Sequence, residues 1–177
     1  SNLTSAIESI QEGFALFDPS GRLVMCNSRF GMHMPDIHEY LVPGLLFNDY
    51  VRMVSNSTFL NLPDDVDASD WAAQRMQRHE SSHVMFNVQM IWDRWVQVSE
   101  HRTFDGGTVV LQTDVSDIMR IERQERERML DDQARLIRAT LEHLDQGVCI
   151  FDKQGRMVGW NQRLVDLLPL PISLMRM

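Results

Sequence analysis

Two histidines and a glutamate near the middle of the chain have the spacing of a zinc-hydrolase motif. The run His79-Glu-Ser-Ser-His83 matches His-Glu-x-x-His, in which two histidines on one helical face bind zinc and the glutamate is the general base. This chemistry requires the helix to extend through His83, whereas an alternating strand pattern begins at Val84. We therefore interpret the match as a solvent-exposed helix end and predict no metal ligand and no catalytic residue. A zinc hydrolase resting on these two histidines is the enzymatic alternative.

The composition argues against other classes of protein. A net charge of −8 is unfavourable for a nucleic-acid-binding surface. No run of roughly 18 apolar residues is present to span a membrane. Two cysteines, Cys26 and Cys149, indicate no disulfide framework and fit a reducing compartment. We therefore predict a cytoplasmic location, no nucleic-acid partner and no membrane insertion of this chain.

A stretch near the N-terminus recurs near the C-terminus. Gly13–Asn27 returns as Gly147–Asn161, an offset of 147 − 13 = 134, and nine of the 22 positions from Glu8 to Arg29 are identical at that offset. A repeat of this length is a domain and not a short structural repeat. We therefore expect one whole domain and the start of a second copy, in a sequence that continues beyond Met177.

Hydrophobic periodicity and turn residues predict an α+β domain. Helical spacing occurs before Gly13, after Asn27 and in a segment that Ser69 would cap, while Val84 to Trp92 alternates with the period of a strand. Asp105-Gly-Gly107 predicts a hairpin turn. Two strands, a helical middle and three strands follow in order, so we expect a five-stranded antiparallel sheet with helices on one face. The predicted strands are 14–17, 22–26, 84–92, 95–104 and 108–113, and the helices are 3–11, 27–30, 47–54 and 70–80.

A long charged helix is predicted to follow the sheet. No proline or glycine interrupts residues 117–146, which gives a helix of about 30 residues and about 45 Å. The alternative to a paired helix is a solvent-exposed connector with salt-bridged faces. We expect a homodimer through residues 3–11 and 117–144, because pairing two copies hides apolar stripes that one domain leaves open. The stripe on the long helix has coiled-coil spacing and consists of Leu130, Ala134, Ile137, Leu141 and Leu144.

Several motifs occur in a fixed order along the first copy. They are Gly13-Phe-Ala-Leu-Phe-Asp with Gly21-Arg-Leu-Val and Asn27, then Trp95-Val-Gln-Val-Ser, Asp105-Gly-Gly107 and Thr113-Asp-Val-Ser-Asp-Ile118. In this order they resemble a PAS domain, the sensory fold of bacterial signalling proteins. The last motif is similar to the Asp-Ile-Thr sequence that closes many PAS domains, with Asp114-Val115-Ser116 in its place.

The resemblance implies an organisation and a function. It places an N-terminal helix at 1–12, a PAS domain at 13–116, a linker helix at 117–146 and the truncated start of a second PAS domain at 147–177. Two PAS units joined by a charged helix resemble the input region of sensor histidine kinases of two-component systems, and less specifically that of diguanylate cyclases. The implied function is a non-enzymatic sensory module that relays ligand or partner binding along the helix. A ligand-free PAS dimerisation scaffold is the alternative.

The resemblance also bears on ligands. Light-sensing relatives attach flavin to a cysteine in an Asn-Cys-Arg-Phe-Leu-Gln run, which is absent here, so we interpret Cys26 as a small buried side chain. No histidine stands out as a haem ligand, and the identity of a cofactor or small-molecule ligand stays open. Gln112 is similar in position to a glutamine of flavin-binding relatives, and a buried glutamine needs hydrogen-bond partners. The candidates that could line a ligand cavity, or fill the core, are Phe30, Phe47, Val51, Val54, Met76, Phe86, Val88, Val98, Val110 and Gln112.

Asp114 and Ser116 are the predicted signal-relay residues. Both lie where the last strand meets the long helix, and their oxygens can accept from free amides of its first turn. A capped and an uncapped joint are two states that a ligand can bias, and the alternative is a plain structural cap. In the second copy, the strands within 148–160 lack the rest of their sheet, and we expect them to be disordered or to exchange with another chain.

Overall fold

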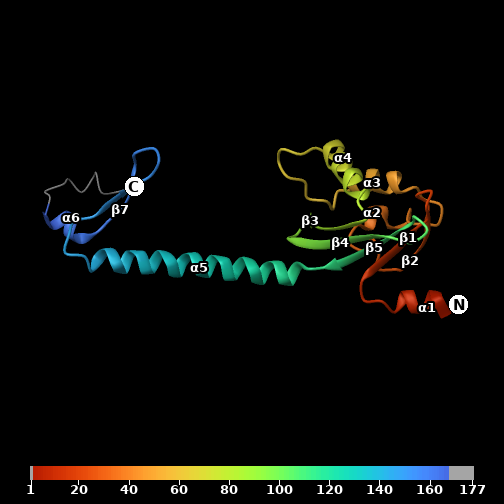
Figure 1. Cartoon of the computed structure of the whole chain (residues 1–177), viewed down its shortest axis with the longest axis horizontal. Coiled ribbons are helices and arrows are strands. Elements are labelled where there is room, and N and C mark those ends of the chain that lie inside the picture. Colours follow the sequence, from red (N-terminus) through yellow and green to blue (C-terminus); the bar gives the residue numbers. More distant parts are fainter. Residues whose placement is uncertain (1, 168–177) are drawn as a thin grey trace. The chain divides into compact units, whose positions relative to one another are not determined.

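The computed structural model of the protein describes residues 2–167, which divide into two compact units between Arg120 and Ile121. The first unit contains a five-stranded antiparallel sheet with the order β2-β1-β5-β4-β3 (Figure 1). This confirms the predicted sheet. Its strands are β1 (Gly13–Phe17), β2 (Leu23–Cys26), β3 (His83–Met90), β4 (Arg94–Arg102) and β5 (Thr108–Asp114).

The order of the strands brings the two ends of the domain together. Strand β1 pairs with β5, with Ala15 opposite Val110, although β5 comes last in the chain. Strand β4 pairs with both β5 and β3, so the three C-terminal strands form the predicted meander. As a result, the strand that leads into the long helix lies at the centre of the sheet.

Three helices lie between β2 and β3 in the sequence and cover one face of the sheet (Figure 1). They are α2 (Pro35–His38), α3 (Phe47–Ser55) and α4 (Ala68–His79), and α1 (Asn2–Glu8) precedes the sheet. Alternate strand residues point to this covered face, as the period of two requires. Phe17 and Val110 on the strands, and Phe30 and Val51 from the helical segment, are almost completely buried there.

Two local predictions need correction. The cap of α4 is Asp67, because its carboxylate accepts a hydrogen bond from the Asp70 amide at 2.8 Å, and Ser69 lies within the first turn instead. The residues after Asn27 form turns and not a helix. Asn27 Oδ1 does accept from the Phe30 amide as a helix cap would, but it also accepts from the Phe14 amide in β1. The asparagine therefore joins a turn to the sheet.

Helix α5 (Ser116–Glu142) follows β5 directly and ends four residues before the predicted bound at 146. In the second unit, β6 (Cys149–Phe151) and β7 (Met157–Trp160) pair antiparallel and precede α6 (Gln162–Leu167). The expected disorder of 148–160 is therefore wrong, because a tight turn allows these strands to pair with each other. Their exchange with another chain stays a prediction, and residues 168–177 of the predicted second copy lie outside the described residues.

Candidate functional site

A cavity of about 40 Å³ lies between the sheet and the helices that cover it. Most of its lining is apolar and comes from α3 and from strands β3 and β4. Four polar side chains also reach it, those of His33, Tyr50, Arg75 and Gln112. Since a water molecule needs roughly 10–15 Å³, the cavity has room for only a very small ligand unless its walls move.

The structure separates the predicted ligand-binding residues into two groups. Strand alternation identifies the face that a side chain occupies, but not which side chains leave space between them. Tyr50 and Arg75 also reach the cavity but were not among the predicted residues. The apolar stripe of its helix indicated burial of Tyr50 but not a place at the cavity, whereas an arginine on a polar helix carries no sequence signal for burial. Of the predicted residues, Val51, Val54, Val88, Val98 and Gln112 line the cavity, whereas Phe30, Phe47 and Val110 fill the core and Met76 and Phe86 pack against it.

Gln112 joins three parts of the fold at the edge of this cavity. Its Oε1 accepts a hydrogen bond from the Gly31 amide at 3.0 Å, and its Nε2 donates to the Tyr50 hydroxyl at 3.0 Å. Strand β5, the turn before α2, and α3 therefore meet at one side chain. Burial raises the pKa of Tyr50 to about 12, so its hydroxyl stays protonated at neutral pH. The half-buried Gln112 thus has a hydrogen-bond partner for its carbonyl oxygen and for its amide nitrogen.

A buried ion pair connects α4 with β4 beside the cavity. Arg75 donates to Glu100 Oε2 at 2.5 Å, and both side chains are almost fully buried. His79 Nδ1 lies 2.8 Å from the other carboxylate oxygen and stacks on Phe47. Burial alone would raise the pKa of Glu100, but the hydrogen bond from His79 and the charge of Arg75 outweigh it, so the pKa is lowered. Glu100 is therefore charged at neutral pH.

The two histidines of the zinc-like motif have different partners. His79 ends α4 and contacts Glu100, whereas His83 begins β3, with its Nδ1 3.0 Å from that of His101. The intervening turn places them on different elements, because the helix does not continue through His83. Within residues 2–167 no three potential ligands are grouped so that they could hold a metal ion.

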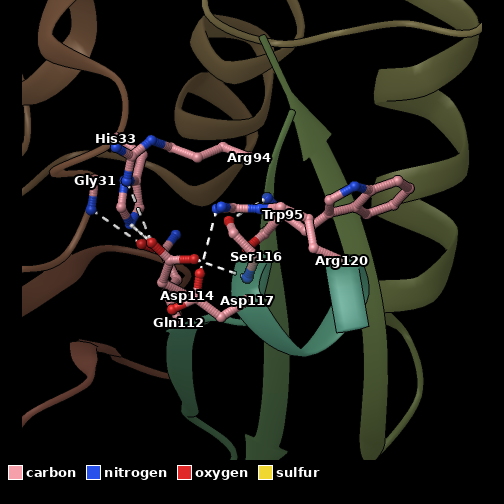
Figure 2. A network of polar contacts seen from close by, with 9 residues as sticks. All are labelled: Gly31, His33, Arg94, Trp95, Gln112, Asp114, Ser116, Asp117 and Arg120. Atoms are coloured by element: carbon pink, nitrogen blue, oxygen red, sulfur yellow. Dashed lines mark hydrogen bonds and ion pairs between the residues drawn. The ribbon is translucent and has the colours of Figure 1, made fainter. Parts of the chain in front are cut away.

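The joint between β5 and α5 carries the second group of candidate residues (Figure 2). Asp114 Oδ1 accepts from the Ser116 amide at 2.9 Å, while Oδ2 lies 3.3 Å from an Arg94 nitrogen and 3.8 Å from His33 Nε2. Burial would raise the pKa of Asp114, but the hydrogen bonds from Ser116 and the charge of Arg94 lower it overall. Asp114 thus acts as the predicted cap.

Ser116 has a different role from the one predicted. Its hydroxyl accepts from the Trp95 amide at 2.8 Å and does not bind an amide of its own helix. The Val115 amide donates to the Trp95 carbonyl at 2.9 Å, which adds a second bond between the joint and the start of β4. The first residue of α5 is therefore fixed to the neighbouring strand through its side chain.

The cavity and the joint are connected by two short segments that touch twice. Gly31 binds Gln112 at the cavity, and two residues further along each segment His33 approaches Asp114 at the joint (Figure 2). Burial lowers the pKa of His33, so the imidazole is mainly neutral at neutral pH. The Gly31 turn therefore contacts Gln112 at the cavity and brings His33 near the carboxylate that caps α5.

The chain belongs to the PAS fold family, whose sequence profile matches residues 7–123 and 141–177. The first match includes the cavity, the Gln112 hydrogen bonds and the joint with α5. PAS domains are typically sensory and non-catalytic, so the chain is a sensory or signalling module by family. None of the helices in residues 2–167 combines the length and the apolar character needed to cross a membrane.

The chain is similar to part of a much larger protein. Over 116 residues it is 32% identical to the "Non-motile and phage-resistance protein" of Caulobacter vibrioides, which covers 66% of this chain and 12% of that protein. Among solved structures, the PAS domain of an HTR-like protein from Haloarcula marismortui matches with a TM-score of 0.39 at 16% identity, over 64% of this chain and 88% of that one. The phage VqmA–DPO complex matches with a TM-score of 0.44 at 14% identity, over 71% and 57% of the two chains.

Proposed function

We propose that the chain is the dimeric input region of a sensor histidine kinase, which relays a binding event in the PAS cavity along α5. The observation that carries this proposal is the double contact between the segments 31–33 and 112–114. At the cavity, the Gly31 amide donates to Gln112, and at the joint, His33 Nε2 lies 3.8 Å from the carboxylate that caps α5. A ligand that moves Gln112 would favour one arrangement of the joint over the other, which is the requirement for a switch.

The exposed apolar side chains of α5 support pairing of two copies. Leu130 and Ile137 are 59% and 52% exposed, and in α1 Leu3 is 60% exposed. A 27-residue helix with this stripe gains stability when a second copy covers it. Because the repeat begins again at Gly147, we also propose that the chain joins a PAS domain to the start of another.

The proposed dimer can be tested with two variants that place the same charge at neighbouring positions of α5. Ile137→Glu places a charge on the proposed contact stripe, whereas Leu136→Glu places it on an equally apolar, 68% exposed position beside the stripe. Light scattering at micromolar concentration should give a dimer for the wild type and for Leu136→Glu, and a monomer for Ile137→Glu. A wild-type mass equal to the 20.6 kDa monomer would rule out the dimer.

The relay is tested at Asp114. Asp114→Ala should lower stability by about 1 kcal/mol whether or not the cap is regulatory. Only a relay makes kinase output of the full-length protein insensitive to its stimulus while the domain stays folded. Asp117→Ala is the control, because that carboxylate lies on the exposed surface of α5 and pairs with Arg120 at 3.4 Å. A normal stimulus response in Asp114→Ala would reduce the motif to a structural cap.

A further inference from the structure

The hydrogen bonds at Gln112 leave one buried proton without an acceptor. A backbone amide can only donate, so the group facing Gly31 must be the Gln112 carbonyl oxygen. The Gln112 amide nitrogen therefore faces Tyr50 and donates to its hydroxyl oxygen. Tyr50 is an acceptor in that bond, and its own O–H must point elsewhere. Among the described residues, the Tyr50 hydroxyl forms a side-chain hydrogen bond only as this acceptor and not as a donor.

This unpaired donor is deeply buried and lies at the cavity. Tyr50 is only 5% exposed, and its side chain is part of the cavity lining. A buried donor proton without an acceptor costs roughly 1–3 kcal/mol, so an acceptor in the cavity would be favourable. The second hydrogen of the Gln112 amide is likewise without a partner among the described residues. The polar side of the cavity thus has two donor protons, from Tyr50 and Gln112, that a ligand with a hydrogen-bond acceptor would satisfy.

The charges around the cavity favour a neutral occupant. Arg75 reaches the cavity, but Glu100 already neutralises its charge at 2.5 Å. An anion would lose its hydration without gaining a free positive partner, which is costly in a buried site. The remaining walls include Val51, Val54 and Val88, which suit an apolar body.

The size of the cavity limits the ligand further. About 40 Å³ is well below the roughly 150 Å³ of a cavity that accommodates benzene. Two of its walls are Met34 and Met90, whose unbranched side chains adapt more readily than others to a new neighbour. A ring of five or six atoms therefore fits only if these methionines move.

We propose that the cavity binds a small, neutral, mainly apolar molecule whose hydrogen-bond acceptor takes the proton of the Tyr50 hydroxyl. Tyr50 is then the residue that selects for an acceptor, and Gln112 connects the occupied hydroxyl to the Gly31 turn. This inference rests on the proposed sensory function and specifies the chemistry of its ligand.

Pyridine and benzene form a matched pair of probes, because they share shape and size but only pyridine has an acceptor. Their affinities for the whole chain are measured by titration at pH 7.5, where pyridine is neutral, with the valine methyl NMR signals of Val51, Val54 and Val88 as the readout. Tyr50→Phe should weaken pyridine binding about threefold to tenfold, the range expected for one neutral hydrogen bond, and leave benzene within about twofold. The benzene titration controls for altered packing in the variant.

The outcomes separate the site from the sensory function. Equal weakening of both probes by Tyr50→Phe, or no binding of either probe to the wild type, overturns the inference. Pyridine binding that depends on Tyr50 upholds the site even if the amide signals of α5 do not respond, in which case the relay fails alone. Conversely, an absent site leaves the relay to be decided by the Asp114 variant.

Discussion

Asn27 and Asn161 hold equivalent positions in the repeat, and their side chains form the same hydrogen bonds in the two units. Each Oδ1 accepts from two backbone amides, one at the start of the hairpin that precedes the asparagine, at 2.9 Å, and one three residues after the asparagine, at 3.1 Å. Each Nδ2 donates to the end of the preceding helix, at the carbonyl of Ile7 in α1 or of Leu141 in α5. A short motif is enough to fix how a helix enters the hairpin.

The two copies differ in what covers these hydrogen bonds. Phe17 and Phe151 are the same residue at the same position of the repeat, yet they are 1% and 55% exposed. In the first copy, three further strands and the helices α2–α4 bury Phe17. The hydrogen bonds of the asparagine are therefore specified by local sequence. Burial of the phenylalanine depends on further strands and helices, which do not cover the second hairpin in the described residues.

The buried ion pair between Arg75 and Glu100 should contribute the largest difference in stability between the copies. It joins α4 to β4, and the described part of the second copy contains neither element. Glu100→Ala leaves the Arg75 guanidinium buried without its carboxylate, and we expect the free energy of unfolding of the first unit to fall by about 3–5 kcal/mol. Denaturant unfolding followed by tryptophan fluorescence measures this loss.

The control for this prediction replaces both charges. Arg75→Met combined with Glu100→Leu removes the unpaired charge and should recover most of the stability that Glu100→Ala loses. If the double variant is as unstable as Glu100→Ala, the loss comes from packing and not from the charge.

The two asparagines give a smaller and directly matched effect. Asn27→Ala removes four hydrogen bonds and should lower the stability of the first unit by roughly 2–4 kcal/mol. Asn161→Ala should leave the unfolding of that unit within about 0.5 kcal/mol, because distant sites act independently. Instead, it should accelerate hydrogen exchange at the amides of Val148 and Leu164. An equal loss in both variants would mean that the units do not unfold separately.

The sequence predicts the fold better than the site. Alternation and turn residues identified the five strands, and helical spacing identified α3 and α4 but not the short α2, because these signals are local. The position of Asn27 before a predicted helical run indicated a helix cap, whereas its hydrogen bonds also run to β1 and α1. The burial of Arg75 could not be predicted, since it depends on packing of α4 against the sheet. The apolar stripe of α3 indicated that Tyr50 is buried, but not that it borders the cavity. Ser116 was placed correctly at the joint, but its partner Trp95 is a backbone group on another strand.

Acidification should also affect the first unit through Glu100. The folded-state pKa of this carboxyl lies below its ordinary value of 4.5, so its stabilising contribution is present above pH 4.5 and is lost as the pH falls through the folded pKa. The effect should be smaller than that of Glu100→Ala, because a protonated carboxyl keeps its volume and can still accept from Arg75. Unfolding curves at pH 7, 5, 4 and 3 should show a weaker decline in Glu100→Gln. An unchanged decline would assign the acid sensitivity to other carboxylates.

The smallest perturbation, thiol labelling, leaves stability unchanged and reports on how well each hairpin is covered. Cys26 is half-buried, and burial together with the nearby Glu8 raises the pKa of its thiol, so it should react slowly with iodoacetamide at pH 8. Cys149 is exposed and should react first, with Cys149→Ser removing the fast phase. Its equivalent in the first copy is Ala15, which is completely buried.

Slow labelling of Cys149 that becomes fast on dilution would show that a second chain covers β6, as the proposed strand exchange requires. Fast labelling at every concentration would mean that this hairpin stays uncovered and that strand exchange does not occur.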